Sequence, residues 1–200
     1  MIDWKLYGDR FARICNEWDK AEKDIKLAEQ VSHKVVFPSI KELRYAGRRI
    51  VEALNGLNDD ATDDDIQKLL QDAEYDCHRA RHDAIDAATA KIAYDIEIAV
   101  SKLGYDPILR AFSKFSELRR KLNLVRAKIT ESRGDRENRE AIYSVIEVTD
   151  FQEIVDLFAE FQENEPVMKG LAKSQRRRTA LSYSIGIASL ILAVITLIIA

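Results

Sequence analysis

The sequence predicts an all-α protein in which a cytosolic antiparallel bundle of five to six helices, one of them long, is followed by a single C-terminal transmembrane helix. Glycine and proline are scarce, at 7 and 3 of 200 residues, which argues against a turn-rich β fold. Apolar residues recur at steps of three and four along most of the chain, the spacing of a buried helix face. Residues 179–200 carry no charged side chain.

The first predicted helix covers residues 3–31, along which the apolar side chains share one face. Pro38 marks the break after it, because the residue before a proline disfavours helical backbone angles. Ser39 and Glu42 then have the spacing of a capping box. A second helix is therefore expected from Ser39 until Gly56 ends it.

The third predicted helix is the longest. Thr62 and Asp65 have the spacing of an N-terminal cap, and one apolar stripe runs from Ile66 to Leu103 without a helix breaker. Gly104 then closes the helix. At 1.5 Å per residue such a helix extends roughly 60 Å, so it is expected to form the axis of the bundle.

The second half of the body is expected to contain shorter helices. Proline is favoured in a first turn, so Pro107 predicts the start of a fourth helix that runs to Ile129. Another is expected over 139–148, although its β-branched residues would also suit a strand. Thr149 and Gln152 form a further capping box, which predicts the start of the last helix of the body. The buried face expected for the fourth helix is formed by Leu109, Phe112, Phe115, Leu118, Leu122, Val125 and Ile129.

Three segments follow from these patterns: residues 1–168 form the bundle, residues 169–178 a basic juxtamembrane collar, and residues 179–200 the transmembrane helix. The last segment extends roughly 33 Å as a helix, which matches the hydrocarbon core of a bilayer. Positive charge beside a span favours the cytoplasmic side. We therefore expect a single-pass, tail-anchored protein with its body in the cytoplasm, most simply at a bacterial inner membrane. The collar residues expected at the lipid surface are Lys173, Arg176, Arg177 and Arg178.

One face of the predicted transmembrane helix consists of small residues at steps of three and four. Such a face lets two helix backbones approach closely in a bilayer, which favours self-association of the chain. A monomeric anchor is the alternative. The bilayer and a second copy of the chain are therefore the first partners expected. The residues of this face, called the small-residue seam below, are Ser182, Gly186, Ser189, Ala193 and Thr196.

Five arginines are candidates for contact with a protein partner or a small anionic ligand. They lie on the second and third predicted helices, where they could face one another across the bundle, and clustered guanidinium groups bind phosphates well. A solvated, ion-paired surface is the competing interpretation. These arginines are Arg44, Arg48, Arg49, Arg79 and Arg81.

A second group of polar residues lies at steps of four on the third helix, so its members stack along one face. His78 and His82 form a weak candidate metal site, but residues on one straight helix cannot surround an ion by themselves. The favoured interpretation is a solvated face, on which Glu74 and Asp86 support the histidines. A polar-core or pH-sensing role is the remaining alternative. No cofactor is expected.

The charge distribution disfavours nucleic acid as a partner. The net charge is −3, and no aromatic residues alternate with the basic ones to stack on bases. Basic residues dominate 107–128, whereas acidic residues dominate 59–86. The simplest explanation is that these two segments pack against each other, and docking of the basic face on anionic lipid is the alternative.

The two cysteines, Cys15 and Cys77, lie in helical patterns beside apolar residues, and no metal-binding cysteine spacing is present. They are expected to be reduced and mostly buried, as in a reducing cytoplasm.

The expected function is that of a non-enzymatic membrane protein whose helical body senses or binds a trigger and whose tail self-associates. Such a layout suits a bacterial membrane effector of the defence or toxicity type, acting by assembly or by perturbing the membrane. This inference rests on architecture alone. A passive membrane scaffold for another protein is one alternative.

An enzyme is the other alternative, either metal-dependent or similar to the HEPN-type ribonucleases. That family carries an arginine separated by four to six residues from a histidine on a helix. Arg44 and Arg49 have this spacing, but Arg49 stands where the family has histidine. Elsewhere in the sequence no histidine follows an arginine at this distance. No catalytic residue is therefore assigned.

Overall fold

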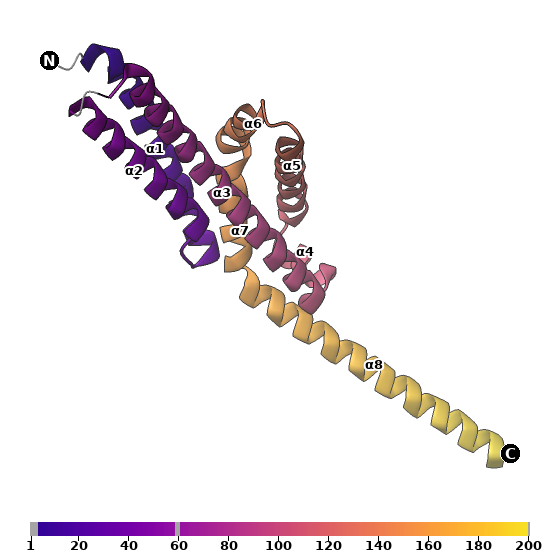
Figure 1. The fold of residues 1–200 in the computed structure, drawn as a ribbon. Helices are drawn as coiled ribbons and strands as arrows, with labels where there is room; N and C mark the ends of the chain where they lie inside the picture. Colours follow the sequence, from indigo (N-terminus) through magenta and orange to yellow (C-terminus); the bar gives the residue numbers. More distant parts are fainter. Residues whose placement is uncertain (1–3, 59–60, 200) are drawn as a thin grey trace.

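A computed structural model describes residues 4–58 and 61–199, with side chains except at 4–6, 58, 190, 192–195 and 197–199. Throughout this part of the chain the regular structure is helical, which confirms the all-α prediction (Figure 1). The elements are α1 (Trp4–Ser32), α2 (Phe37–Asn58), α3 (Asp63–Leu103), α4 (Tyr105–Ala111), α5 (Phe115–Gly134), α6 (Arg139–Ile146), the π-helical turn η1 (Glu147–Phe151), α7 (Gln152–Glu163) and α8 (Glu165–Ile199).

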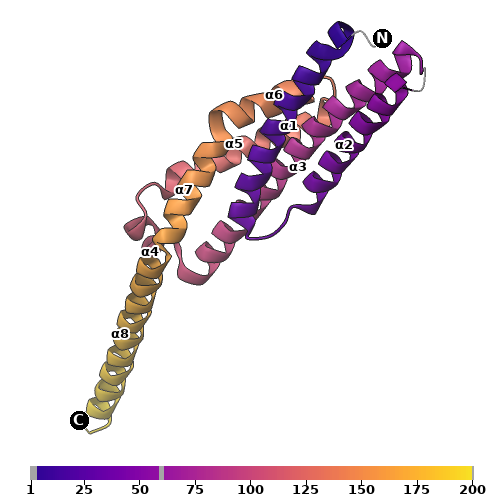
Figure 2. The ribbon, with the colours of Figure 1, turned by 90° about the vertical axis from the view of Figure 1, so that its left-hand side faces the viewer.

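Helix α3 packs against both α1 and α2 (Figures 1 and 2). Helix α2 runs antiparallel to α3, whereas α1 runs parallel to it, since Arg10 and Glu17 meet Glu74 and Arg81 in the same order along the chain. The predicted length of α3 is confirmed, and its ends are as expected. Thr62 Oγ1 accepts a hydrogen bond from the Asp65 amide at 3.2 Å. Gly104 ends the helix with a φ of 83°, which only glycine adopts without strain. Small residues in the buried middle of α3 allow this close packing: Ala73, Cys77, Ala80, Ala84 and Ala88.

Helices α4 to α7 cover the C-terminal half of α3 and bury an aromatic cluster. The Phe161 ring on α7 lies 5.8 Å from that of Phe112 and 5.9 Å from that of Phe115. Phe158 lies 6.1 Å from Phe161 in a stacked arrangement. Because all four rings are buried, this cluster joins the α4–α5 region to α7.

The fourth predicted helix is not continuous. It breaks between α4 and α5, where Phe112 adopts an extended backbone with φ −134°. On either side of this break, the rings of Phe112 and Phe115 both contact Phe161. Leu109, expected in the buried face, is 44% exposed, and Ile108 is buried in its place.

Two predicted capping boxes are wrong. Helix α2 begins at Phe37 instead of Ser39, because the proline that follows Phe37 is tolerated in a first turn. Ser39 is buried, and its hydroxyl has no hydrogen-bond partner in the described part of the chain. Gly56 does not end α2, which continues to Asn58.

The second wrong box is that of Thr149 and Gln152. The predicted helix over 139–148 exists as α6, but η1 connects it to α7 without a break. Thr149 Oγ1 donates to the Val145 carbonyl at 2.7 Å instead of capping a helix. The π-helical turn therefore carries the backbone from α6 to α7 through the residues that resembled a start signal, a geometry often found at functional sites.

Helix α8 runs from the bundle as a single projecting helix (Figures 1 and 2). Its base is buried at Met168 and Ala172, and Arg176 donates to the Lys102 carbonyl at 2.5 Å. Over the described residues, none of the helices combines the length and the apolarity needed to cross a bilayer. Among the seam residues, Ala193 lies outside the described side chains. The other four are exposed on α8: Ser182, Gly186, Ser189 and Thr196.

The expectation of two mostly buried thiols is half wrong, because Cys15 is exposed and Cys77 is buried. Burial raises the pKa of Cys77 to about 12. A thiol-specific reagent such as Ellman's reagent is therefore expected to label about one thiol per folded chain, since the thiolate is the reactive form. Cys15→Ser should abolish this fast labelling. Fast labelling of Cys15→Ser before denaturation would contradict the buried position of Cys77.

Candidate functional site

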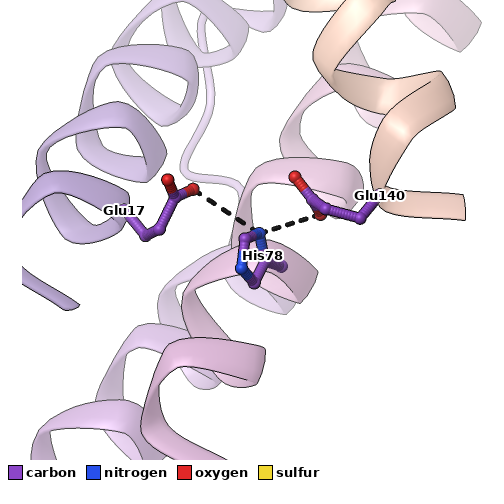
Figure 3. A group of neighbouring side chains, drawn as sticks. All are labelled: Glu17, His78 and Glu140. Atoms are coloured by element: carbon purple, nitrogen blue, oxygen red, sulfur yellow. Dashed lines mark ion pairs between the residues drawn. The ribbon is translucent and has the colours of Figure 1, made fainter. Parts of the chain in front are cut away.

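An ionic cluster lies where α1, α3 and α6 meet, at mid-height of α3. Figure 3 shows three of its members: Glu17 from α1, His78 from α3 and Glu140 from α6. Helix α3 presents its polar residues at steps of four, so His78 and His82 lie on one face, toward α6. We call the group of Glu17, Asp24, His78, Arg81, His82, Glu140 and Glu147 the ionic cluster.

Arg81 is the centre of the ionic cluster and is 1% exposed. Its guanidinium lies 3.0 Å from Glu17 Oε2 and 3.1 Å from Glu147 Oε2. It also donates a hydrogen bond to Glu140 Oε1. One buried side chain therefore ties together α1, α6 and η1, and the planar guanidinium suits this because it can bond several carboxylates at once.

The two histidines contact the same carboxylate oxygen. His78 Nδ1 lies 2.8 Å and His82 Nε2 2.9 Å from Glu140 Oε2. The His82 ring also stacks on Tyr143, with centroids 3.8 Å apart. Burial, and then the charge of Arg81, lowers the pKa of His82 to about 3. Burial likewise lowers the pKa of His78, although Glu17 opposes the shift. Both rings are therefore neutral at pH 7.

The acids of the ionic cluster differ in environment. Burial alone would raise the pKa of Glu17, but the hydrogen bond from Lys20 and the charge of Arg81 outweigh it and lower that pKa. Asp24 behaves in the opposite way. Burial, reinforced by the negative charge of Glu147, raises its pKa to about 7. Neither oxygen of Asp24 accepts a hydrogen bond within the described residues, so this carboxyl group is buried and unpaired.

The interior of the ionic cluster has more acids than bases. Three glutamates share the guanidinium of Arg81, and Lys20 bonds Glu17 Oε1 at 2.7 Å. Asp24 adds a further acid close to Arg81. A buried excess of carboxyl groups is costly, and it favours the binding of a proton or a cation.

The solvated-face interpretation of the α3 histidines is therefore wrong. His82 is buried, and Glu74 accepts a hydrogen bond from Arg10 on α1 at 3.0 Å. Asp86 accepts from the Tyr143 hydroxyl at 2.7 Å. The polar-core alternative describes the structure, because α1 and α6 cover the face that the spacing alone left open.

The five candidate binding arginines do not share one surface. Arg81 is inside the ionic cluster. Arg49 donates to Asp76, and Arg79 Nε lies 3.4 Å from Glu42, so both tie α2 to α3. Whether any of them contacts a ligand stays a prediction. The exposed ones are Arg44, Arg48 and Arg79.

The basic face of the fourth predicted helix packs against other acids than expected. Its lysines pair with α7 and η1, because the α5–α6 connection folds that part of the chain back onto α5. In the acidic segment 59–86, Asp86 lies 3.1 Å from Arg133, a residue near the end of α5. The lysine pairs are Lys114 with Glu160, Lys121 with Glu153, and Lys128 with Asp150.

Four members of the ionic cluster were missed in the sequence: Glu17, Asp24, Glu140 and Glu147. A signal was present. Glu17 and Asp24 are seven residues apart on the edge of the α1 stripe, and Glu140 and Glu147 have the same spacing. Seven residues are about two helical turns, so each pair shares a face. Nothing local shows that both pairs meet Arg81.

No protein-family model matches the chain, and comparison with curated proteins and with solved structures likewise finds no match.

Proposed function

We propose that this is a membrane-anchored helical sensor or effector, in which α1 to α7 bind a trigger in the cytoplasm and the distal part of α8 anchors the chain and self-associates. The observation that carries the proposal is the ionic cluster, which ties α6 and η1 to α1 and α3, with only α7 between η1 and α8. The uncharged residues 179–200 supply the anchor.

The ionic cluster suits a switch better than it suits a stabilising core. Burying ions costs several kcal/mol in desolvation, which the pairing repays only with good geometry, so such clusters add little net stability. A change in its charge therefore shifts the balance between two arrangements at modest cost. Asp24 adds to this, because its buried carboxyl has no partner among the described residues.

A path leads from the ionic cluster to α8. Glu147 belongs to η1, which continues into α7, and α7 joins α8 through Asn164. The base of α8 packs against α4 and α7, where Met168 is buried. A displacement of α6 and α7 would therefore move the base of α8. The consequence proposed is a change in the association of the small-residue seams of neighbouring chains.

The anchor is tested by expressing the full chain, a truncation after Lys173 and Gly186→Ile in bacteria. The full chain is expected in the membrane fraction, and the truncated chain outside it, because the truncation removes the apolar segment. Gly186→Ile is expected to keep the protein in the membrane and to reduce cross-linking between copies, because a bulky side chain separates the backbones.

Ile187→Leu is the matched control, since it changes an exposed α8 side chain without adding bulk to the seam. Membrane potential recorded in the same cells reports whether assembly perturbs the bilayer. Recovery of the full chain outside the membrane fraction would refute the anchor. Unchanged cross-linking of Gly186→Ile would refute self-association through the small-residue seam.

A further inference from the structure

We propose that Glu17, His78 and Glu140 form a binding site for a first-row divalent transition metal ion, with Zn²⁺ as the best match. The three residues come from α1, α3 and α6, so the ion would join three helices. No local motif encodes this site, because the ligands are 61 and 62 residues apart along the chain.

The geometry suits a metal ion of this size. One ligand atom from each residue lies within 4.8 Å of the other two. His78 Nδ1 is 3.5 Å from Glu17 Oε2 and 2.8 Å from Glu140 Oε2 (Figure 3). Ligands at about 2.0–2.1 Å from a tetrahedral Zn²⁺ stand about 3.4 Å apart. The observed separations lie on both sides of this value, so small side-chain rotations complete the site.

The Nδ1 atom of His78 lies between a hydrogen-bond acceptor and a donor. This atom faces Glu140 Oε2, an acceptor, at 2.8 Å and the Arg81 guanidinium, a donor, at 3.3 Å. A protonated Nδ1 satisfies Glu140 but opposes Arg81, and an unprotonated Nδ1 does the reverse. An unprotonated Nδ1 directed at two carboxylate oxygens is the arrangement of a metal ligand. A bound ion would turn the unfavourable contact with Glu140 into shared coordination.

The charge of the surroundings is consistent with a bound cation. Glu17, Glu140 and Glu147 share the guanidinium of Arg81, and Lys20 bonds Glu17 Oε1 at 2.7 Å, so three carboxylates face two cationic side chains. A metal ion would bind beside the guanidinium and share these carboxylates with it.

The ligand types select the class of metal. An imidazole nitrogen favours Zn²⁺, Fe²⁺, Ni²⁺ or Cu²⁺, whereas Mg²⁺ and Ca²⁺ prefer oxygen ligands alone. His82 is not one of the three ligands. It contacts Glu140 Oε2, the oxygen that would bind the ion, at 2.9 Å and so helps to position this carboxylate.

The test is equilibrium dialysis of the full chain in detergent against Zn²⁺ and, separately, against Mg²⁺, with metal content measured by mass spectrometry. About one Zn²⁺ per chain is expected, with no Mg²⁺ bound. His78→Gln and Glu140→Gln are each expected to weaken Zn²⁺ binding at least about ten-fold. The control is His33→Asn, which removes an exposed histidine at the end of α1.

Circular dichroism confirms that each variant is folded, and a Co²⁺-substituted wild-type chain provides a second readout in its visible absorption. The proposal is overturned if the wild-type chain retains no Zn²⁺, or if His78→Gln binds as much as His33→Asn. Binding does not depend on membrane insertion. A chain that binds no Zn²⁺ would therefore overturn the metal site without affecting the proposed membrane anchor. A chain recovered outside the membrane fraction would overturn the anchor without affecting the metal site.

Discussion

Replacing Arg81 with methionine is expected to destabilise the folded chain by about 3–5 kcal/mol, the usual cost of removing one partner of a buried ion group. Methionine retains the unbranched apolar stem of the side chain and removes the guanidinium, so the loss reports mainly on the ionic contacts. Three carboxyl groups from α1, α6 and η1 would lose their shared donor. Chemical denaturation of the full chain in detergent, followed by circular dichroism, measures the change.

Arg48→Met is the control, because the Arg48 side chain is exposed and pairs with Glu52 on its own helix at 2.8 Å. Both side chains of this pair are exposed, at 76% and 43%. Exposed pairs contribute about 0–1 kcal/mol, so this variant should be nearly as stable as the wild type. Equal losses for the two variants would show that Arg81 is not the centre of a buried cluster.

Replacing Asp24 with asparagine is expected to stabilise the chain at pH 8 by a few kcal/mol, because it removes a buried carboxylate. Burial raises the pKa of Asp24 from 3.8 to about 7. Between these values the folded chain holds a proton that the unfolded chain has released, so stability falls as the pH rises through this window. The advantage of Asp24→Asn should therefore shrink by on the order of 2 kcal/mol at pH 5.

The measurement compares the variant with the wild type at both pH values, with EDTA present to keep metal away. Because variant and wild type contain the same histidines, the comparison cancels the contribution of these histidines to the pH dependence of stability. That contribution has the opposite sign to the contribution of Asp24. Burial lowers the pKa of His82 to about 3, so its contribution to stability is lost as the pH falls below about 6.5. Asp19→Asn, on the exposed side of α1, is the control. An advantage of Asp24→Asn that is equal at pH 5 and pH 8 would rule out a buried, titrating Asp24.

Helices with a continuous apolar stripe were predictable from sequence, and the break inside the fourth predicted helix was not. The long stripe of α3 and its closing Gly104 are local patterns, and both are present. The break at Phe112 has no local signal, because the apolar spacing continues through it. At the break, Phe112 contacts Phe161, which lies about 50 residues away in the chain. The local pattern also fails at Thr149, whose capping spacing is overridden by a helix that continues from α6 into α7.

The candidate site was likewise predictable from sequence only in part. Spacing on α3 placed His78 and His82 on one face, but it did not show whether water or protein covers that face. Nor did it separate Arg81, which is buried, from Arg79, which is exposed, since both lie among similar neighbours in the chain.

Periodicity was therefore enough for the helical class, the long axis of the bundle and the uncharged segment 179–200, because each depends on neighbours within a few turns. The ionic cluster depended on the packing of α1 and α6 against α3. Its carboxyl groups reach Arg81 from 59 to 66 residues away, and only tertiary contact excludes the water that would otherwise make them ordinary surface acids.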